Sequence, residues 1–216
     1  MMLPLAPQSP RFGYVLAPGA GAGMRHPFLE AISQALRERG VATLRYEFPY
    51  MEAGRGRPDP PLVAAVRVRE AVARAREEWP GLPLVAGGKS FGGRMTSTAQ
   101  AEEPLPGVGG LVFLGFPLHP PGKPSVARAD HLFRVEIPML FLQGTRDDFA
   151  ELSLLTEVCE RLGPRAALEL VEGADHSFRI GRSGRAGRTG GTERADVIVK
   201  LATRIIEWGA ALGRGA

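Results

Sequence analysis

Short apolar runs alternate with longer amphipathic segments along most of this chain, and this alternation constrains the fold more than any other feature. Most of the runs are apolar throughout, as expected of strands that are covered on both faces. Strands separated by helical segments predict an α/β fold, here a three-layer α/β/α sandwich around a mainly parallel, six-stranded sheet. The six runs are residues 13–17, 41–48, 83–87, 110–116, 138–143 and 167–171.

Four other segments have apolar residues at helical spacing. The first starts near Phe28 and stops at Gly40, a residue type that often follows a helix end. The second is bounded by Pro60-Pro61 and Pro80, and we expect it to bury Leu62, Val66, Val72 and Trp79. The remaining two are marked by Leu155, Val158, Cys159 and Leu162, and by Ile198, Leu201, Ile205, Trp208 and Leu212.

Glycine and proline, with 28 and 19 residues, fall mainly between the apolar runs. They therefore punctuate a folded chain and do not form a disordered one. Residues 49–60 and 179–194 fit neither pattern, and we predict that both are loops. There is no internal repeat and no linker between separate cores, so we predict one domain over residues 1–216.

The net charge of +4 does not by itself indicate a nucleic-acid partner. The 27 basic residues are accompanied by 23 acidic ones along most of the chain. Arginine supplies nearly all of the positive charge, since lysine occurs only as Lys89, Lys123 and Lys200. A chain rich in Ala, Gly, Arg and Pro and without Asn is what a GC-rich genome encodes, and we take this as the first explanation.

The sequence contains neither a membrane span nor a secretory signal. No run approaches the roughly 18 apolar residues that a spanning helix needs, and the first residues lack a basic region followed by an apolar one. Cys159 is the only cysteine, so we expect a buried thiol and no intrachain disulfide. We therefore expect a cytoplasmic protein, a monomer or homodimer.

The segment from Leu82 to Met95 carries the most specific chemical signal, because an apolar strand leads through Gly88-Lys89-Ser90-Phe91-Gly92 into a helical segment. This is a G-x-S-x-G pattern in a strand–turn–helix context. Glycines two residues to either side of Ser90 let strand and helix pass closely while the serine sits on a strained turn. The start of the new helix also places backbone N–H groups beside the hydroxyl. The pattern predicts that Ser90 is a nucleophile.

Two other interpretations of the same residues are weaker. Gly88-Lys89-Ser90 resembles the end of a phosphate-binding P-loop, but position 83 is a proline where that motif needs a glycine. Ser90 is also a residue type that caps helices. The flanking glycines and the preceding strand favour the nucleophile.

A serine nucleophile needs a base and an acid that orients the base, and both follow in the chain. Asp147 and Asp148 come after the strand at 138–143, and His176 comes after the strand at 167–171. The order Ser, Asp, His is that of α/β-hydrolases. We favour His176 as the base and Asp147 over Asp148 as the acid.

The other candidates have weaker contexts. Asp175 adjoins His176, so we expect it to fix its own loop. The remaining histidines are expected at a helix start (His26), in a proline-rich turn (His119) and before Leu132-Phe133 (His131). None of these three has the context of a catalytic base.

A loop of glycine and alanine residues, whose small side chains leave the backbone accessible, follows the first strand: Gly19-Ala20-Gly21-Ala22-Gly23. We predict that the N–H groups of Ala20 and Phe91 form an oxyanion hole. A minor alternative is that this loop binds a dinucleotide, since Glu47 lies near the sequence separation expected for a ribose-binding acid. The loop does not match G-x-G-x-x-G, however, because position 24 is methionine.

With PGAG, GKSFGG, GTRD and DHSF at the ends of successive strands, nearly the whole chain resembles the α/β-hydrolase superfamily. The likeness is to small, lidless proteins similar to dienelactone hydrolase and their poorly characterised relatives. It implies hydrolysis of a small carboxylic ester or thioester through Ser90, Asp147 and His176. It also implies a hydrolase core that lacks the first two customary strands and any cap domain.

The resemblance has departures. Dienelactone hydrolase uses a cysteine at the position of Ser90, so its lactone substrate is not transferred to this chain. Pro18 stands where many relatives have a histidine before the oxyanion loop. Only about twenty residues separate Phe116 from Pro138, where a cap is often inserted. An open site follows, with Tyr50, Met51, Phe116 and Leu118 as its expected walls; we expect neither a cofactor nor a metal ion.

Two alternatives to a serine hydrolase remain open. The chain is either a catalytically silent binding module that keeps the hydrolase core, or a binder of polyanions through the arginine- and glycine-rich segment after His176. The arginines in question are Arg179, Arg182, Arg185, Arg188 and Arg194. They would line an anion site near the histidine or contact a phosphate backbone, although a solvated loop is the simpler interpretation. Aromatic residues for base stacking are lacking there beyond Phe178.

Overall fold

The computed structural model describes residues 1–180 and 190–212. Seven strands form one sheet in the order β1-β3-β2-β4-β5-β6-β7, and all neighbours are parallel except β1 and β3. The strands are β1 (Met2–Leu5), β2 (Phe12–Ala17), β3 (Val41–Tyr46), β4 (Leu84–Lys89), β5 (Val108–Leu114), β6 (Met139–Gly144) and β7 (Ala166–Val171). The helices are α1 (Pro27–Arg37), α2 (Pro49–Glu52), α3 (Pro61–Glu78), α4 (Phe91–Glu102), α5 (Leu152–Leu162) and α6 (Gly190–Leu212), with 3-10 helices η1 (Ala127–Arg134) and η2 (Gly163–Arg165).

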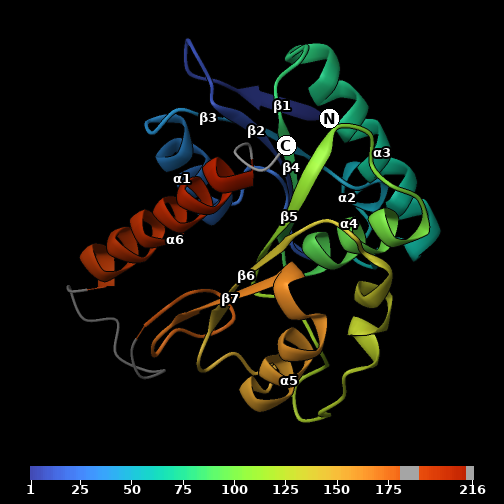
Figure 1. Cartoon of the computed structure of the whole chain (residues 1–216), viewed down its shortest axis with the longest axis vertical. Helices are drawn as coiled ribbons and strands as arrows, with labels where there is room; N and C mark the ends of the chain where they lie inside the picture. The colour runs from blue at the N-terminus through green and yellow to red at the C-terminus, as the bar shows by residue number, and fades with distance from the viewer. Residues whose placement is uncertain (181–189, 213–216) are drawn as a thin grey trace.

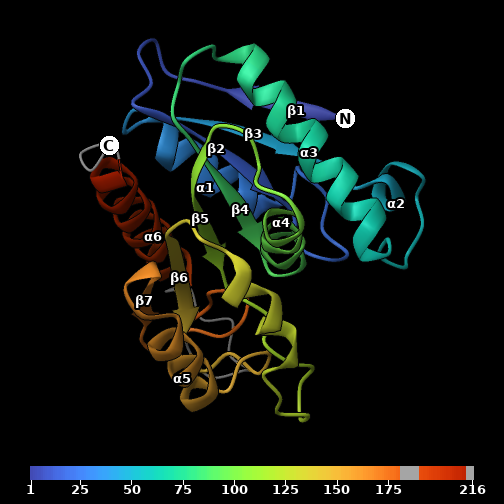
Figure 2. The ribbon, with the colours of Figure 1, turned by 45° about the vertical axis from the view of Figure 1, so that its right-hand side comes forward.

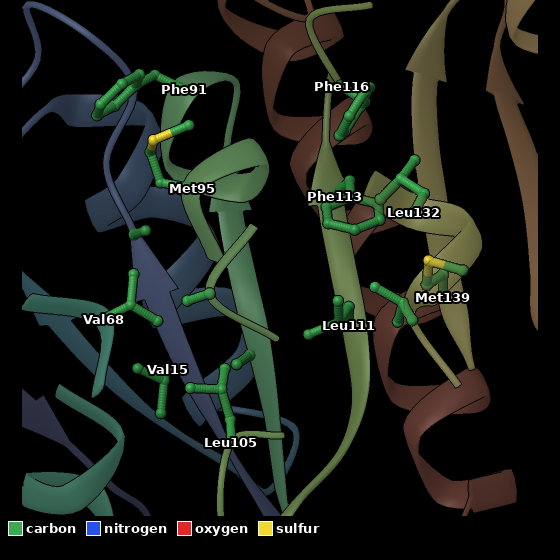
Figure 3. Packing of buried hydrophobic residues seen from close by; sticks show 14 of the residues in the cluster. Val15, Val68, Phe91, Met95, Leu105, Leu111, Phe113, Phe116, Leu132 and Met139 are labelled. Atoms are coloured by element: carbon green, nitrogen blue, oxygen red, sulfur yellow. The ribbon is translucent and has the colours of Figure 1, made fainter. Parts of the chain in front are cut away.

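Helices cover both faces of the sheet, so the predicted three-layer α/β architecture is confirmed (Figures 1 and 2). Helices α1 and α6 pack on one face, in a core that includes Leu29, Ile32 and Leu201. The other face packs against α3, α4, α5 and η1; in Figure 3, Val68 of α3 approaches Val15 of β2, and Leu132 of η1 approaches Phe113 of β5. Every residue of β2 and β3 is buried, as expected of strands with both faces covered.

The apolar runs of the sequence predicted six strands, whereas the described sheet has seven, with β1 as the additional strand. β1 runs antiparallel to β3, with Met2 opposite Tyr46 and Leu5 opposite Thr43. This strand has four residues, including Pro4, and lies at the edge of the sheet, where a missing N–H donor is tolerated. The core therefore has one strand before β2, where the resemblance implied none.

Three helices differ from the sequence predictions. The short helix α2 lies within the segment 49–60 that was predicted as a loop. Helix α6 begins at Gly190, inside the other predicted loop, while residues 181–189 lie outside the described part. In α3, Val72 is buried as predicted, but Leu62 and Val66 are 73% and 58% exposed. The other buried residues of this helix are Ala64, Ala65, Val68, Ala71 and Ala75.

The strand order places one crevice at the centre of the sheet. The chain leaves β2 toward β3 on one side and returns to β4 on the other, so the carboxyl ends of β2 and β4 adjoin at a switch point. Loops at such a point diverge and leave room for a ligand. Ser90 follows β4 directly, and the glycine-rich loop follows β2.

Within residues 1–180 and 190–212, no cap domain covers this edge of the sheet. Residues 115–138, between β5 and β6, contain only the 3-10 helix η1. Cys159 is an unpaired, buried thiol, as predicted, and burial raises its pKa to about 12. Within the described ranges, no helix combines the length and the apolar character that crossing a membrane requires.

Candidate active site

The turn between β4 and α4 holds Ser90 in a strained conformation, with φ of 49° and ψ of −116°. Such a backbone is rare for a residue with a side chain. A Cβ atom at Gly88 would lie 2.2 Å from the carbonyl oxygen of Ala17, and one at Gly92 would lie 2.4 Å from that of Pro18. The two glycines are therefore required by the close approach of strand, turn and helix, as the G-x-S-x-G pattern predicts.

The hydroxyl of Ser90 does not cap the helix that follows it. It lies 2.8 Å from Nε2 of His176, 86 residues further along the chain. The other ring nitrogen, Nδ1, lies 2.7 Å from Oδ2 of Asp147. Because an ionised carboxylate only accepts hydrogen bonds, Nδ1 carries the proton and Nε2 is free to accept one from Ser90.

The side chain of Asp147 is completely buried. Its Oδ2 accepts hydrogen bonds from Nε2 of Gln143 at 2.6 Å and from His176, and its Oδ1 accepts one from the amide of Phe149 at 2.8 Å. These three donors fix the carboxylate and stabilise its charge. Phe149 also stacks on His176, with ring centroids 4.3 Å apart.

Neither of the two neighbouring acids takes the place of Asp147. Asp148 is exposed. Asp175 turns back on its own loop, where its Oδ1 accepts hydrogen bonds from the amides of Ser177 and Arg179 at 2.8 and 2.9 Å. The structure thus brings together the three residues that the sequence analysis selected, Ser90, Asp147 and His176, in one hydrogen-bonded series.

The other three histidines are engaged elsewhere. His26 accepts a hydrogen bond from the amide of Phe28 at the start of α1. His119 accepts one from the amide of Glu151 at 2.7 Å and thereby fixes the start of α5. His131 is hydrogen-bonded to the hydroxyl of Ser97 at 2.7 Å, and burial, helped by Arg94 and Arg134, lowers its pKa to about 4.

Two backbone N–H groups are available beside Ser90. Ala20 lies in the glycine-rich loop and lines the same cavity as Ser90, and Phe91 is the first residue of α4. Among the hydrogen bonds of the described residues, neither amide has an acceptor. The loop is held by Gly21, whose amide donates a hydrogen bond of 3.3 Å to the hydroxyl of Tyr50.

A cavity of about 390 Å³ opens at Ser90 and His176. The glycine-rich loop, the start of α1 with Phe28 and Leu29, and Phe149 form its walls. The four expected wall residues, Tyr50, Met51, Phe116 and Leu118, do not line it. They belong to the core cluster that includes residues of α3, α4 and η1, whereas the cavity is lined by Phe28 and Leu29 of α1. This prediction is therefore corrected for the cavity at Ser90.

Lys89 is a further residue of the site, and the sequence indicated no role for it beyond the rejected P-loop pattern. The residue is half-buried, but its Nζ is buried, has no hydrogen-bond partner among the described residues and lies 5.7 Å from the ring centroid of Phe178. A Cβ atom at Gly115 would lie 3.1 Å from Nζ and 3.5 Å from both Asp147 Oδ2 and His176 Nδ1, so the ammonium group adjoins that pair. Burial lowers the pKa of Lys89 to about 8, against the opposing effect of Asp147 and Asp175.

Two arginines of the predicted anion site reach the same cavity. Arg179 and Arg194 line it together with Lys89 and His26. Burial lowers the pKa of His26, and the charges of Arg194, Arg179 and Lys89 act in the same direction. Arg182, Arg185 and Arg188 lie outside the described residues.

Known proteins share this architecture. Residues 10–208 match a family model described as "Alpha/beta hydrolase domain". An alpha-beta serine hydrolase homologue from Coxiella burnetii superposes with a TM-score of 0.73 at 16% identity, covering 94% of this chain and 90% of that one. A serine hydrolase without lid from Xanthomonas campestris gives 0.71 at 18% identity, with 96% and 88% covered. Dienelactone hydrolase from Anabaena variabilis gives 0.68 at 18%, with 94% and 90% covered. At these identities the structural likeness establishes the fold.

Proposed function

The chain belongs to the alpha/beta hydrolase domain family, and from this membership we propose that it is a serine hydrolase that cleaves a small carboxylic ester or thioester. The observation that carries the proposal is the unbroken series of hydrogen bonds from Asp147 through His176 to Ser90. A silent binding module with the same core would have no need of a strained serine turn aligned with a histidine and a buried carboxylate.

The first half of the reaction forms an acyl-enzyme. Oγ of Ser90 attacks the acyl carbon while Nε2 of His176 takes the hydroxyl proton. Asp147 remains ionised, holds Nδ1–H and stabilises the imidazolium that forms. The oxyanion receives hydrogen bonds from the N–H groups of Ala20 and Phe91, which have no other acceptor among the described residues. As the bond to the leaving group breaks, the alkoxide or thiolate takes the proton from His176.

The second half repeats the chemistry with water. His176 removes a proton from a water molecule, the oxygen attacks the acyl carbon, and the bond to Ser90 breaks as its Oγ takes the proton back. The products are a carboxylic acid and free enzyme. The volume of about 390 Å³ at Ser90 is at the small end of ligand pockets and supports a small substrate.

Labelling with a fluorophosphonate probe tests the nucleophile directly. We expect the folded wild-type protein to carry one adduct on Ser90, identified by peptide mass, and Ser90→Ala to carry none. Hydrolysis of 4-nitrophenyl esters should fall by about 10³-fold or more in that variant. Ser153→Ala is a matched control, because Ser153 lies on α5, is exposed and, among the described residues, forms a side-chain hydrogen bond only to Glu151. An adduct that persists in Ser90→Ala would refute the proposal.

A further inference from the structure

The cavity at Ser90 has a positive lining without a compensating acid. Among the described residues that line it, Lys89, Arg179 and Arg194 are cations and none is aspartate or glutamate. Asp147 lies nearby but is committed to His176, and Asp175 is committed to the amides of its own loop. Asp147 and Asp175 therefore offset part of the charge of Lys89, whereas the charges of Arg179 and Arg194 have no carboxylate partner in the part of the chain that the structure describes.

The two arginines are free to bind a ligand. Neither guanidinium forms a hydrogen bond or an ion pair with any residue in the ranges 1–180 and 190–212. Arg45, Arg67 and Arg204, by contrast, all contact carboxylates. A guanidinium presents its donors in a planar fork that matches a carboxylate, and both arginines line the same cavity.

Lys89 is the second, independent observation. It lines the cavity next to Ser90, and its Nζ is buried and has no hydrogen-bond partner among the described residues. A buried ammonium group without a hydrogen-bond acceptor is unfavourable for folding, and such groups concentrate at functional sites. An anion in the cavity would supply the hydrogen-bond acceptor that Nζ lacks.

We propose that the substrate carries an anionic group, a carboxylate, which Arg179 and Arg194 bind. The positive charge of Lys89 attracts the same carboxylate. The neighbouring ester or thioester bond is thereby held at Ser90. This inference deepens the proposed hydrolase function and rests on it. The cavity volume of about 390 Å³ fits a short-chain hemiester of a dicarboxylic acid, or the ester of a small hydroxy acid.

The test compares pairs of esters that differ only in charge. The first pair, with the anion on the acyl side, is 4-nitrophenyl hydrogen succinate and its neutral methyl ester. The second pair, with the anion on the leaving group, is an acetylated hydroxybenzoate and its methyl ester. In at least one pair we expect kcat/KM of the anionic ester to exceed that of the neutral ester by roughly tenfold at low salt, and the ratio to fall as salt rises.

Substitution of the arginines tests the assignment. We expect Arg179→Gln and Arg194→Gln each to reduce the ratio by several-fold, and Arg179→Lys, which keeps the charge, to retain part of it. Arg37→Ala is the matched control: Arg37 is an exposed arginine in the last turn of α1, whose first turn lines the cavity. We expect this control to leave both rates unchanged.

Binding separates the two proposals. Calorimetry with Ser90→Ala, titrated with monomethyl succinate and with dimethyl succinate, measures the anion site without hydrolysis. If monomethyl succinate binds more tightly and Arg179→Gln removes the difference, the anion site is supported even where hydrolysis fails. If neither ester pair nor this titration shows a preference for the anion, the inference is overturned while the hydrolase proposal stands. Arginine variants that lose salt-dependent binding of single-stranded DNA but keep the ester ratio would also overturn it.

Discussion

The hydroxyl of Tyr50 accepts a hydrogen bond of 3.3 Å from the amide of Gly21, in the glycine-rich loop beside Ser90. The amide of Tyr50 donates to Oδ2 of Asp59 at 2.9 Å, and Asp59 also binds Arg55. The loop is thereby fastened to α2 and to the segment that follows it. Tyr50 was predicted to contact the substrate; its observed position makes it a support for the loop that carries Ala20.

Tyr50→Phe removes this hydrogen bond and keeps the aromatic ring. A neutral hydrogen bond contributes about 1 kcal/mol, so we expect kcat for a neutral ester to fall by roughly three- to tenfold, with little change in KM, because the loop holds the oxyanion donor less well. Tyr14→Phe is the control. It loses a buried hydrogen bond to the carbonyl of Val112, 3.0 Å long, away from the cavity. It should lower the free energy of unfolding and leave kcat unchanged; equal losses of kcat in both variants would contradict the supporting role.

Asp147→Asn should reduce kcat by about 10³–10⁴-fold with little change in stability. An amide in this position can donate to Nδ1 of His176 and so favours the tautomer in which Nε2 can no longer accept the proton of Ser90. The adjacent Asp148→Asn is the matched control, since Asp148 is exposed. The measurement is kcat of both variants on one ester. A loss of kcat in Asp148→Asn as large as that in Asp147→Asn would refute the assignment of Asp147 as the acid that orients His176.

The fold was predictable from sequence because strands buried on both faces must be apolar throughout, and six such runs stand out. The seventh strand was missed because Pro4 interrupts its pattern and only an edge position tolerates the proline. The buried face of α3 was mispredicted for a different reason. Its alanines allow close packing against the sheet and α4, while Leu62 and Val66 remain exposed, and helical spacing alone does not distinguish these faces.

The candidate site was predictable where local sterics or strand order dictated it. The glycines around Ser90 are forced by contacts with Ala17 and Pro18, and the loops after β6 and β7 carry Asp147 and His176 to the same edge. The walls of the cavity depend on which face of the sheet each aromatic residue joins, and this is set by tertiary packing. Lys89 gave no signal because a lysine at the end of a strand ordinarily extends into solvent.

His131 should make the protein less stable in mild acid. Its pKa is lowered to about 4 in the folded state, mainly by burial, against about 6.5 in the unfolded chain. Between these values the unfolded state binds a proton that the folded state excludes. The free energy of unfolding therefore falls as the pH drops from about 6.5 to about 4, by about 3 kcal/mol in all.

Urea unfolding of wild type and His131→Gln at about pH 7 and about pH 5 checks this prediction. Glutamine retains a partner for the hydroxyl of Ser97 but does not titrate. The variant is expected to be the less stable protein at the higher pH, and the difference should shrink at the lower pH. Parallel changes in both proteins would show that other groups cause the acid sensitivity.

Lys89→Met should stabilise the protein near neutral pH at the expense of selectivity. Burial lowers the pKa of Lys89 to about 8, compared with about 10.4 in the unfolded chain, so below pH 8 the folded state carries a buried charge. Removing that charge should raise the free energy of unfolding by about 3 kcal/mol at about pH 7. From about pH 8 to about pH 10 the wild type loses the buried charge, and the advantage of the variant should shrink.

Cys159, whose raised pKa has the opposite effect on the pH dependence, is common to both proteins and cancels in the difference. Lys200→Met, at an exposed lysine, is expected to show no such dependence. If the anion site is correct, the ratio of kcat/KM for the anionic over the neutral ester also falls in Lys89→Met. A variant that is less stable than wild type at about pH 7 would mean that the packing of the lysine stem outweighs the cost of its buried charge.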